Sequence, residues 1–247
     1  MIALVLIVAN HAWALDTAWT NTGSGSFNDP GNWNNGVPTN TDVAYFTNGA
    51  TFTVNFTTNQ QSKGMVISNG TTVILDLHDG TSRTYEATIV GSGATAGNPL
   101  TGDGQIFIRN AALVVTDPGV LDLNNTPNYN SGKRLDLLRS TLIVSNGATV
   151  NYGYVAALAG YGGDRIVVTG TNSLLDGDDW DALNSGSTMI VTNGGRWSPS
   201  HLYADGGATV IVAGTSSRID MGSVIFASGS STVLASDGAR WTSTSLV

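Results

Sequence analysis

Residues 141–150 read TLIVSNGATV, and four later segments repeat this pattern: RIVVTGTNSLL (165–175), TMIVTNGGRW (188–197), TVIVAGTSSRI (209–219) and TVLASDGARW (232–241). Each segment has a short apolar run, a small polar residue, a turn and a second apolar position. The runs begin 24, 23, 21 and about 22 residues apart. This period is too short for a strand–helix–strand unit, which takes roughly 30 residues or more. It is typical of one coil of a β-solenoid.

The turns in these repeats alternate between two forms. Asn-Gly at 146–147 and at 193–194 makes a tight turn, whereas the turns that begin at Gly170 and Gly214 are one residue longer. Asp-Gly at 237–238 ends the series. Gly, Asn and Asp adopt positive φ at low cost, so both forms can redirect a strand. An antiparallel β-sandwich is the alternative fold, but sandwiches rarely keep a fixed period with alternating turns.

Each repeat has room for three short strands: the apolar run, a second strand after the turn, and a third strand before the next repeat. The second strand carries one large apolar residue in every repeat, namely Val150, Leu175, Trp197, Ile219 and Trp241. One coil cannot bury its inward side chains alone, but coils stacked about 4.8 Å apart bury them together and pair every strand. The sequence therefore predicts an all-β fold, a parallel β-helix with triangular coils of about 22 residues.

Side-chain alternation assigns the two faces of the first strand. The inward column is predicted to hold Leu142, Ile166, Met189 and Val210. The outward column is predicted to hold Ile143, Val167, Ile190, Ile211 and Val233. Outward apolar residues have two explanations: the general preference of strands for β-branched side chains, or a contact surface for another chain or a flat ligand. Under the second explanation these five are the candidate contact residues for self-association.

The chain divides into four expected segments. Residues 1–14 contain an apolar run followed by Ala-Trp-Ala, which is typical of a secretory signal peptide, although no Lys or Arg precedes the run. Residues 15–50 are expected to form an aromatic capping coil that closes the core. Residues 51–139 are expected to form irregular coils with long polar inserts. Residues 140–247 are expected to form the regular coils, and their end within a coil indicates a fragment.

Aromatic residues stand out in the opening segment WTNTGSGSFNDPGNWNNGVPTNTDVAYF (19–46). Besides the capping role, Trp19 and Trp33 have an alternative interpretation as a platform for sugar rings. This opening segment and repeats such as TLIVSNGATV resemble the passengers of bacterial autotransporters and related exported surface β-helix proteins. The resemblance covers the opening segment and the residues from Ser140 onward. It implies a right-handed parallel β-helix that acts at the cell surface as an adhesin, a matrix component or a spacer.

Composition limits the partners. The 247 residues carry a formal net charge of −8, and only 11% of them are charged. This balance argues against nucleic acid and anionic membranes as partners. The first apolar run is too short to span a bilayer, so no membrane span is expected. Cysteine is absent, so an exported fold would rely on its core and strand pairing rather than on disulfides.

One acidic segment is the main candidate for a chemical site, and it contains Asp176, Asp178, Asp179 and Asp181. Carboxylates this close can bind Ca²⁺ through their oxygens or supply the acid and base of a glycosidase. A polysaccharide lyase would also need a basic residue, and Arg165 is the nearest candidate. A solvated turn explains the same residues without any chemistry. The spacing of the His residues matches neither a nucleophilic triad nor a zinc site.

These observations favour a non-enzymatic, exported structural or adhesin-like β-helix, either secreted or held at the cell surface. No cofactor is expected, with Ca²⁺ at the acidic segment as the alternative, and the expected partners are a second copy of the chain or a cell-surface glycan or protein. Two alternatives stay open: a carbohydrate-active β-helix enzyme, either lyase or hydrolase, and a glycan-binding module. A groove with several carboxylates and a base would favour the enzyme, exposed coplanar aromatic rings the binding module, and a Thr/Ser/Asn surface the structural role.

Overall fold

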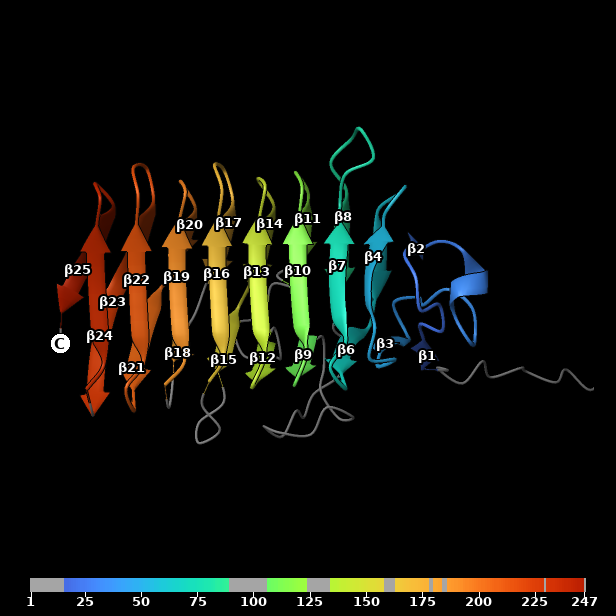
Figure 1. Ribbon diagram of the computed structural model, residues 1–247, viewed down its shortest axis with the longest axis horizontal. Coiled ribbons are helices and arrows are strands. Elements are labelled where there is room, and N and C mark those ends of the chain that lie inside the picture. The colour runs from blue at the N-terminus through green and yellow to red at the C-terminus, as the bar shows by residue number, and fades with distance from the viewer. Residues whose placement is uncertain are drawn as a thin grey trace, which may run out of the picture.

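A computed structural model describes residues 16–88, 106–123, 134–157, 163–177, 180–183, 186–228 and 230–246. These residues form strands through most of their length, with one short 3-10 helix, η1 (Pro30–Asn32). The pairings within both sheets are parallel, so the described chain is an all-β protein with the architecture of a parallel β-solenoid (Figure 1). The predicted signal peptide, residues 1–14, lies outside the described residues.

The strands form three stacks, and successive strands of the chain enter the first, second and third stack in turn. Within the described residues, the first stack is a nine-stranded sheet. Its strands in stacking order are β2 (Gly25–Ser26), β4 (Thr51–Asn55), β7 (Thr72–Asp76), β10 (Ala112–Thr116), β13 (Thr141–Ser145), β16 (Arg165–Thr169), β19 (Thr188–Thr192), β22 (Thr209–Ala213) and β24 (Thr232–Ser236).

The other two stacks join into one sheet of sixteen strands within the described residues. The second stack contains β5 (Gln60–Ser62), β8 (Thr84–Ala87), β11 (Val120–Asp122), β14 (Thr149–Tyr152), β17 (Leu174–Gly177) and β20 (Arg196–Ser198). The third stack contains β1 (Thr17–Ala18), β3 (Val43–Phe46), β6 (Gly64–Ser68), β9 (Ile106–Arg109), β12 (Arg134–Leu138), β15 (Tyr154–Ala157), β18 (Trp180–Leu183) and β21 (His201–Asp205). Both continue into the long strands β23 (Arg218–Ser228) and β25 (Arg240–Leu246), which join them.

The ladder register confirms the predicted inward columns. In the first stack, consecutive rungs place Leu142, Ile166, Met189 and Val210 opposite one another. In the second stack, consecutive rungs do the same for Val150, Leu175, Trp197, Ile219 and Trp241. These residues belong to or pack against one buried apolar cluster, so the core runs continuously along the stacked rungs.

One predicted outward residue is wrong. Val233 pairs with Val210 and packs against the core, whereas Leu234 pairs with Ile211 and takes the outward position. Leu234 is 52% exposed. The last apolar run has only two apolar residues, so its alternation fits two registers that differ by one residue. A slip of one residue exchanges the two faces of a strand, and pairing with β22 decides between the two registers.

The middle of the chain belongs to the same stacks as the regular repeats. Phe52 pairs with Val73, Val73 with Leu113, and Leu113 with Leu142, so the first stack continues without a break from β4 to β13. The longer connections in this region contain the two predicted polar inserts, which lie outside the described residues: 91–104 and 124–133. The core columns therefore do not depend on rungs of equal length.

Aromatic side chains pack together at the N-terminal end of the core. The Trp19 ring stacks on Phe52 with centroids 5.5 Å apart and meets the Trp33 ring edge-on at 5.1 Å. Trp33 Nε1 donates a hydrogen bond to the Phe27 carbonyl oxygen at 2.9 Å. Trp19 and Trp33 are only 2% and 4% exposed. The interpretation of these two rings as a sugar platform is therefore wrong, because their faces are covered by protein.

The longer turns of the repeat bind the tight turns of the neighbouring rungs. The buried Ser173 hydroxyl oxygen accepts a hydrogen bond from the Gly147 N–H at 2.9 Å, and the hydroxyl donates to the Thr169 carbonyl oxygen at 2.8 Å. Two rungs later, Ser217 accepts in the same way from the Gly194 N–H at 3.0 Å. The alternation of turn types thus satisfies backbone groups that neighbouring rungs would otherwise leave unpaired.

Candidate functional site

The outer face of the nine-stranded sheet carries a column of apolar side chains. Seven neighbouring strands place one such residue at the same outward position. This set, called the apolar column, consists of Ile74, Val114, Ile143, Val167, Ile190, Ile211 and Leu234. Four of the five predicted contact residues lie in it, and Val233 does not. The structure extends the predicted column toward the N-terminus by two rungs.

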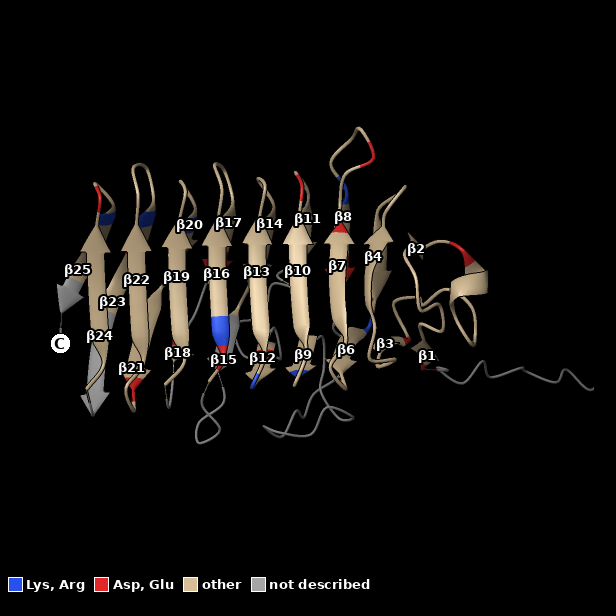
Figure 2. Cartoon of the chain, viewed as in Figure 1, with Lys and Arg blue, Asp and Glu red and all other residues tan. Residues whose placement is uncertain are grey.

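The face around the apolar column is nearly free of charge (Figure 2). From β4 to β24, the charged residues in the strands of this sheet are Asp76 and Arg165. The side chains of the column are half-buried, except for Val167, which is 8% exposed, and the more exposed Leu234. Depletion of charge around partly exposed apolar residues is typical of the centre of a protein interface.

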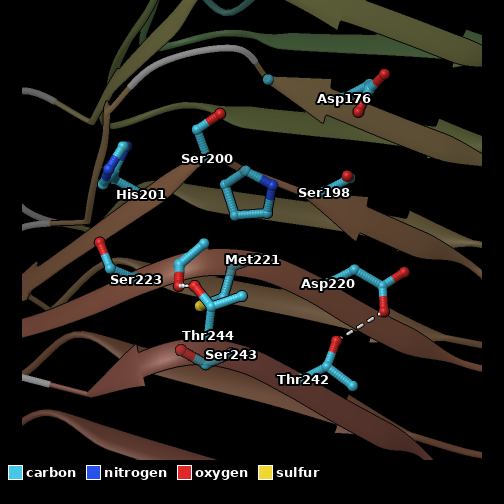
Figure 3. A pocket seen from close by; sticks show the side chains of 13 residues that line it. Asp176, Ser198, Ser200, His201, Asp220, Met221, Ser223, Thr242, Ser243 and Thr244 are labelled. Carbon is cyan, nitrogen blue, oxygen red and sulfur yellow. Dashed lines mark hydrogen bonds between the residues drawn. The ribbon is translucent and has the colours of Figure 1, made fainter.

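A groove of about 850 Å³ lies where the second stack passes into the third (Figure 3). Its lining comes from β17, β20, β23 and β25, from the link between β20 and β21, and from His201 at the start of β21. Asp176, Ser198, Asp220 and Thr242 occupy the same outward position in successive rungs of the second stack. Figure 3 shows these four side chains toward one side of the groove and His201 toward the other. We call this the corner groove.

Two arginines and a threonine hold Asp220 in the wall of the corner groove. Its Oδ2 atom lies 2.9 Å from Arg196 Nε and 3.1 Å from Arg218 Nε. Its Oδ1 atom accepts a hydrogen bond from the Thr242 hydroxyl at 2.9 Å. The ion pairs are part-exposed, so each contributes little to stability. Their effect is to orient the carboxylate and to offset the repulsion between arginines of neighbouring rungs.

Two glycines of the corner-groove lining, Gly177 and Gly222, lie where the packing of neighbouring rungs leaves no room for a side chain. A Cβ atom at Gly177 would lie 2.6 Å from the Tyr152 hydroxyl oxygen, and one at Gly222 would lie 2.5 Å from the Ser200 carbonyl oxygen. Both distances are shorter than a carbon atom tolerates, so neither position accepts a side chain unless its neighbours shift. The packing of the rungs therefore shapes the groove.

Asp181 does not belong to a solvated acidic site. It is 1% exposed, and its Oδ2 atom accepts hydrogen bonds from the Tyr152 hydroxyl at 2.5 Å and from Trp197 Nε1 at 3.2 Å. Burial, and then the Asp181 charge, raise the pKa of Tyr152 well above its usual value. Asp176 instead faces outward and lines the corner groove, whereas Asp181 is buried in the core. The predicted grouping of Asp176 with Asp181 is therefore wrong.

The remaining sequence candidates for chemistry lie apart. Asp178 and Asp179 are outside the described residues. Arg165, the candidate base of a lyase, begins β16 on the outer face and does not line the corner groove. Among the described residues, no three His, Cys, Asp or Glu side chains form a group that could hold a metal ion. Calcium binding by the acidic segment stays the untested alternative to the expectation that the chain has no cofactor.

A second buried carboxylate lies at the corner between the third and first stacks. Asp164 is 2% exposed, and its Oδ1 atom accepts a hydrogen bond from the Ser140 N–H at 2.9 Å. Its Oδ2 atom has no hydrogen-bond partner among the described residues. Burial raises the pKa of Asp164 above its usual value, and the backbone N–H donors of Ser140 and Arg139 oppose the rise. This carboxyl group lies outside both candidate surfaces.

Sequence reasoning missed the corner groove. One signal was present: each of its four aligned residues directly follows an inward apolar residue of the second strand, so alignment of the repeats would have collected Asp176, Ser198, Asp220 and Thr242. The other side of the groove had no such signal. His201 lies on the third stack, and only the bend between stacks brings it to the same groove.

Comparison of this chain with known proteins gives no relative from which a function could be transferred. No protein-family model, no curated protein and no solved structure matches this chain. In the part of the chain that the structure describes, no helix is long and apolar enough to cross a membrane. Function therefore has to be inferred from the fold, the apolar column and the corner groove.

Proposed function

We propose that the chain is an exported, non-enzymatic β-helix that acts as a surface spacer, matrix component or adhesion element and associates side by side with a second copy of itself. The observation that carries this proposal is the apolar column on an almost uncharged outer face. The resemblance of residues 19–46 and of the later repeats to exported surface proteins supports the location.

The stacked core suits a spacer. Nine strands at the usual spacing extend the first stack over about 38 Å, and each added rung lengthens it by about 4.8 Å. We expect the coils to be triangular, with about 22 residues where no insert lengthens them. We also expect a right-handed coil, because about 98% of crossovers between parallel strands of one sheet are right-handed.

The size of the outer face fits a second copy as the occupant. Five-residue strands about 16 Å long, stacked over about 38 Å, give a face of roughly 600 Å². Two such faces together bury about 1,200 Å², which is the lower bound for a stable protein interface. Charges on this face are few, so pairing two copies would desolvate few ionised groups, which is the main cost that opposes such contacts.

Sedimentation velocity over a concentration series tests self-association. The wild-type chain is expected to form dimers or larger species, and the double variant Ile190→Thr, Ile211→Thr to weaken them by roughly tenfold or more, because each partner loses apolar contact area. The matched control is Val120→Thr, Leu174→Thr, which changes outward apolar residues of the second stack. The proposal would be contradicted if the wild-type chain were monomeric, or if the Ile190→Thr, Ile211→Thr variant associated as strongly as the wild type.

A separate assay tests the absence of enzymatic activity. The purified chain is incubated with neutral and acidic polysaccharides from pH 5 to 9, and new reducing ends and unsaturated products are measured. No product is expected. Activity that disappears in Asp176→Asn would show that the corner groove is catalytic and would refute the non-enzymatic role.

A further inference from the structure

The corner groove has no part in the proposed self-association, because it lies on the sixteen-stranded sheet and not on the outer face. It crosses four rungs, and its lining is mostly polar, unlike the apolar column. Its volume of about 850 Å³ lies within the range of roughly 300 to 1,000 Å³ that is usual for small-ligand sites. We propose that the corner groove binds a segment of a neutral polysaccharide.

Hydroxyl groups dominate the polar lining of the groove. They belong to Ser198, Ser200, Ser223, Thr242, Ser243 and Thr244. A hydroxyl both donates and accepts hydrogen bonds, whereas the Asp176 and Asp220 carboxylates accept only. A ligand that satisfies this lining must offer donors and acceptors in many directions along its length. The hydroxyl groups of sugars do so, and the Asp176 carboxylate can accept from the O–H groups of adjacent sugar carbons.

Several of these polar groups are already held in place by the protein. The Thr242 hydroxyl donates to Asp220 and the Thr244 hydroxyl to the Gly222 carbonyl oxygen, so their remaining lone pairs are left for a ligand. Arg196 and Arg218 fix Asp220 from the other side. Groups that are ordered before binding cost little entropy when a ligand arrives, which favours even a shallow site.

The charges around the groove favour a neutral ligand. Asp176 and Asp220 are the acidic side chains of the lining, and the charge of Asp220 is offset by its ion pairs with Arg196 and Arg218. An anionic sugar would meet the Asp176 carboxylate, whereas the attraction of Asp220 for a cationic one is reduced by its two arginine partners. Pro199 and Met221 also belong to the lining, but both are buried, so the groove offers a ligand mainly polar groups.

The geometry also repeats in the direction of the solenoid. Asp176, Ser198, Asp220 and Thr242 are spaced by one rung each, or about 4.8 Å. A polymer with a short chemical repeat can make a similar contact at each rung. A compact ligand of the same polarity would use only part of this row, which is why we assign a chain-like glycan.

Isothermal titration calorimetry with neutral hexasaccharides (cellohexaose, xylohexaose and mannohexaose) and with the anionic hexagalacturonate tests the proposal. At least one neutral hexasaccharide is expected to bind the wild-type chain more tightly than hexagalacturonate. Ser198→Trp fills the centre of the groove and is expected to weaken that binding at least tenfold. The matched control is Asn151→Trp, which lies in the same outward column two rungs earlier, does not line the groove and is expected to bind as the wild type does.

Three outcomes would overturn the proposal: no neutral hexasaccharide binds, hexagalacturonate binds more tightly than any neutral one, or Ser198→Trp binds as the wild type does. Thermal unfolding of each variant shows whether the fold is retained. Asp176→Asn provides a second change in the groove with no added volume, and it is also expected to weaken binding. The Ile190→Thr, Ile211→Thr variant is expected to bind sugar normally, so the failure of one proposal is distinguishable from the failure of the other.

Discussion

Replacing Val191 by Asp tests whether the inward columns carry the stability of the solenoid. Val191 is fully buried and lies between Val168 and Val212 of the neighbouring rungs, which are also fully buried. Loss of the apolar side chain costs about 1.5 to 3 kcal/mol. A carboxyl group without a partner in the same place adds about 2 kcal/mol or more, even when it is protonated. The expected loss in the free energy of unfolding is therefore about 5 kcal/mol.

That loss is large against the roughly 5 to 15 kcal/mol that stabilises an ordinary domain. Urea denaturation followed by circular dichroism and by tryptophan fluorescence measures it, since the buried Trp197 reports on the adjacent second stack. The matched control is Ile190→Asp, one residue earlier on β19, because that side chain points outward and is only half-buried. At protein concentrations below those at which the chain self-associates, it is expected to cost less than about 1 kcal/mol. A wild-type transition in Val191→Asp, or equal losses in the two variants, would refute the assigned alternation.

Three further predictions concern the buried carboxylates and metal binding. Tyr152→Phe removes the hydroxyl that donates to the buried Asp181. Urea denaturation is expected to show a loss of about 2 to 3 kcal/mol in the free energy of unfolding. An unchanged midpoint would show that the stability does not depend on this hydrogen bond. Asp164 has a raised pKa because it is buried, so the folded state favours its protonated form, and stability is expected to fall as the pH rises from the usual pKa of 3.8 through the raised one. Asp164→Asn should abolish that fall and stabilise the chain at pH 7 by about 1 kcal/mol. If the free energy of unfolding changed with pH in the same way in the wild type and the variant, this prediction would be contradicted. Asp181 is already bonded to Tyr152 and Trp197, so neither excess Ca²⁺ nor a chelator is expected to shift the melting temperature, and a rise with Ca²⁺ would restore the acidic segment as a metal site.

The two candidate surfaces bear differently on the functional alternatives. The corner groove contains two carboxylates and a histidine, as a carbohydrate-active site would, but Asp220 is bonded to two arginines and a threonine. The aromatic platform that a glycan-binding module would display is absent at Trp19 and Trp33, which are buried. The Thr-rich outer face with its apolar column agrees best with a structural role. The sugar-binding proposal therefore rests on hydroxyl groups rather than on stacking rings.

Periodicity along the chain was enough to predict the register of the solenoid wherever a repeat was complete. Each full repeat carries its own apolar pair and its own turn, so counting from one turn to the next was enough to align Trp197 with Ile219 and Trp241. The local pattern failed at Val233, where the apolar run is short and two registers fit. Pairing with β22 resolved that ambiguity. The two strands are far apart in sequence, so the local pattern of β24 does not contain the register of this pairing.

The surroundings of the polar residues depend on contacts between rungs and could not be predicted from the local sequence. In the sequence, Asp181 is one of several neighbouring acids, and such a run is usually solvated. In the fold it is a buried acceptor whose donors, Tyr152 and Trp197, come from other rungs. The corner groove likewise exists because β17, β20, β23 and β25 stack at a bend. Apolar columns follow from periodicity along the chain, whereas the partners of a polar group are chosen by which rungs and corners the fold brings together.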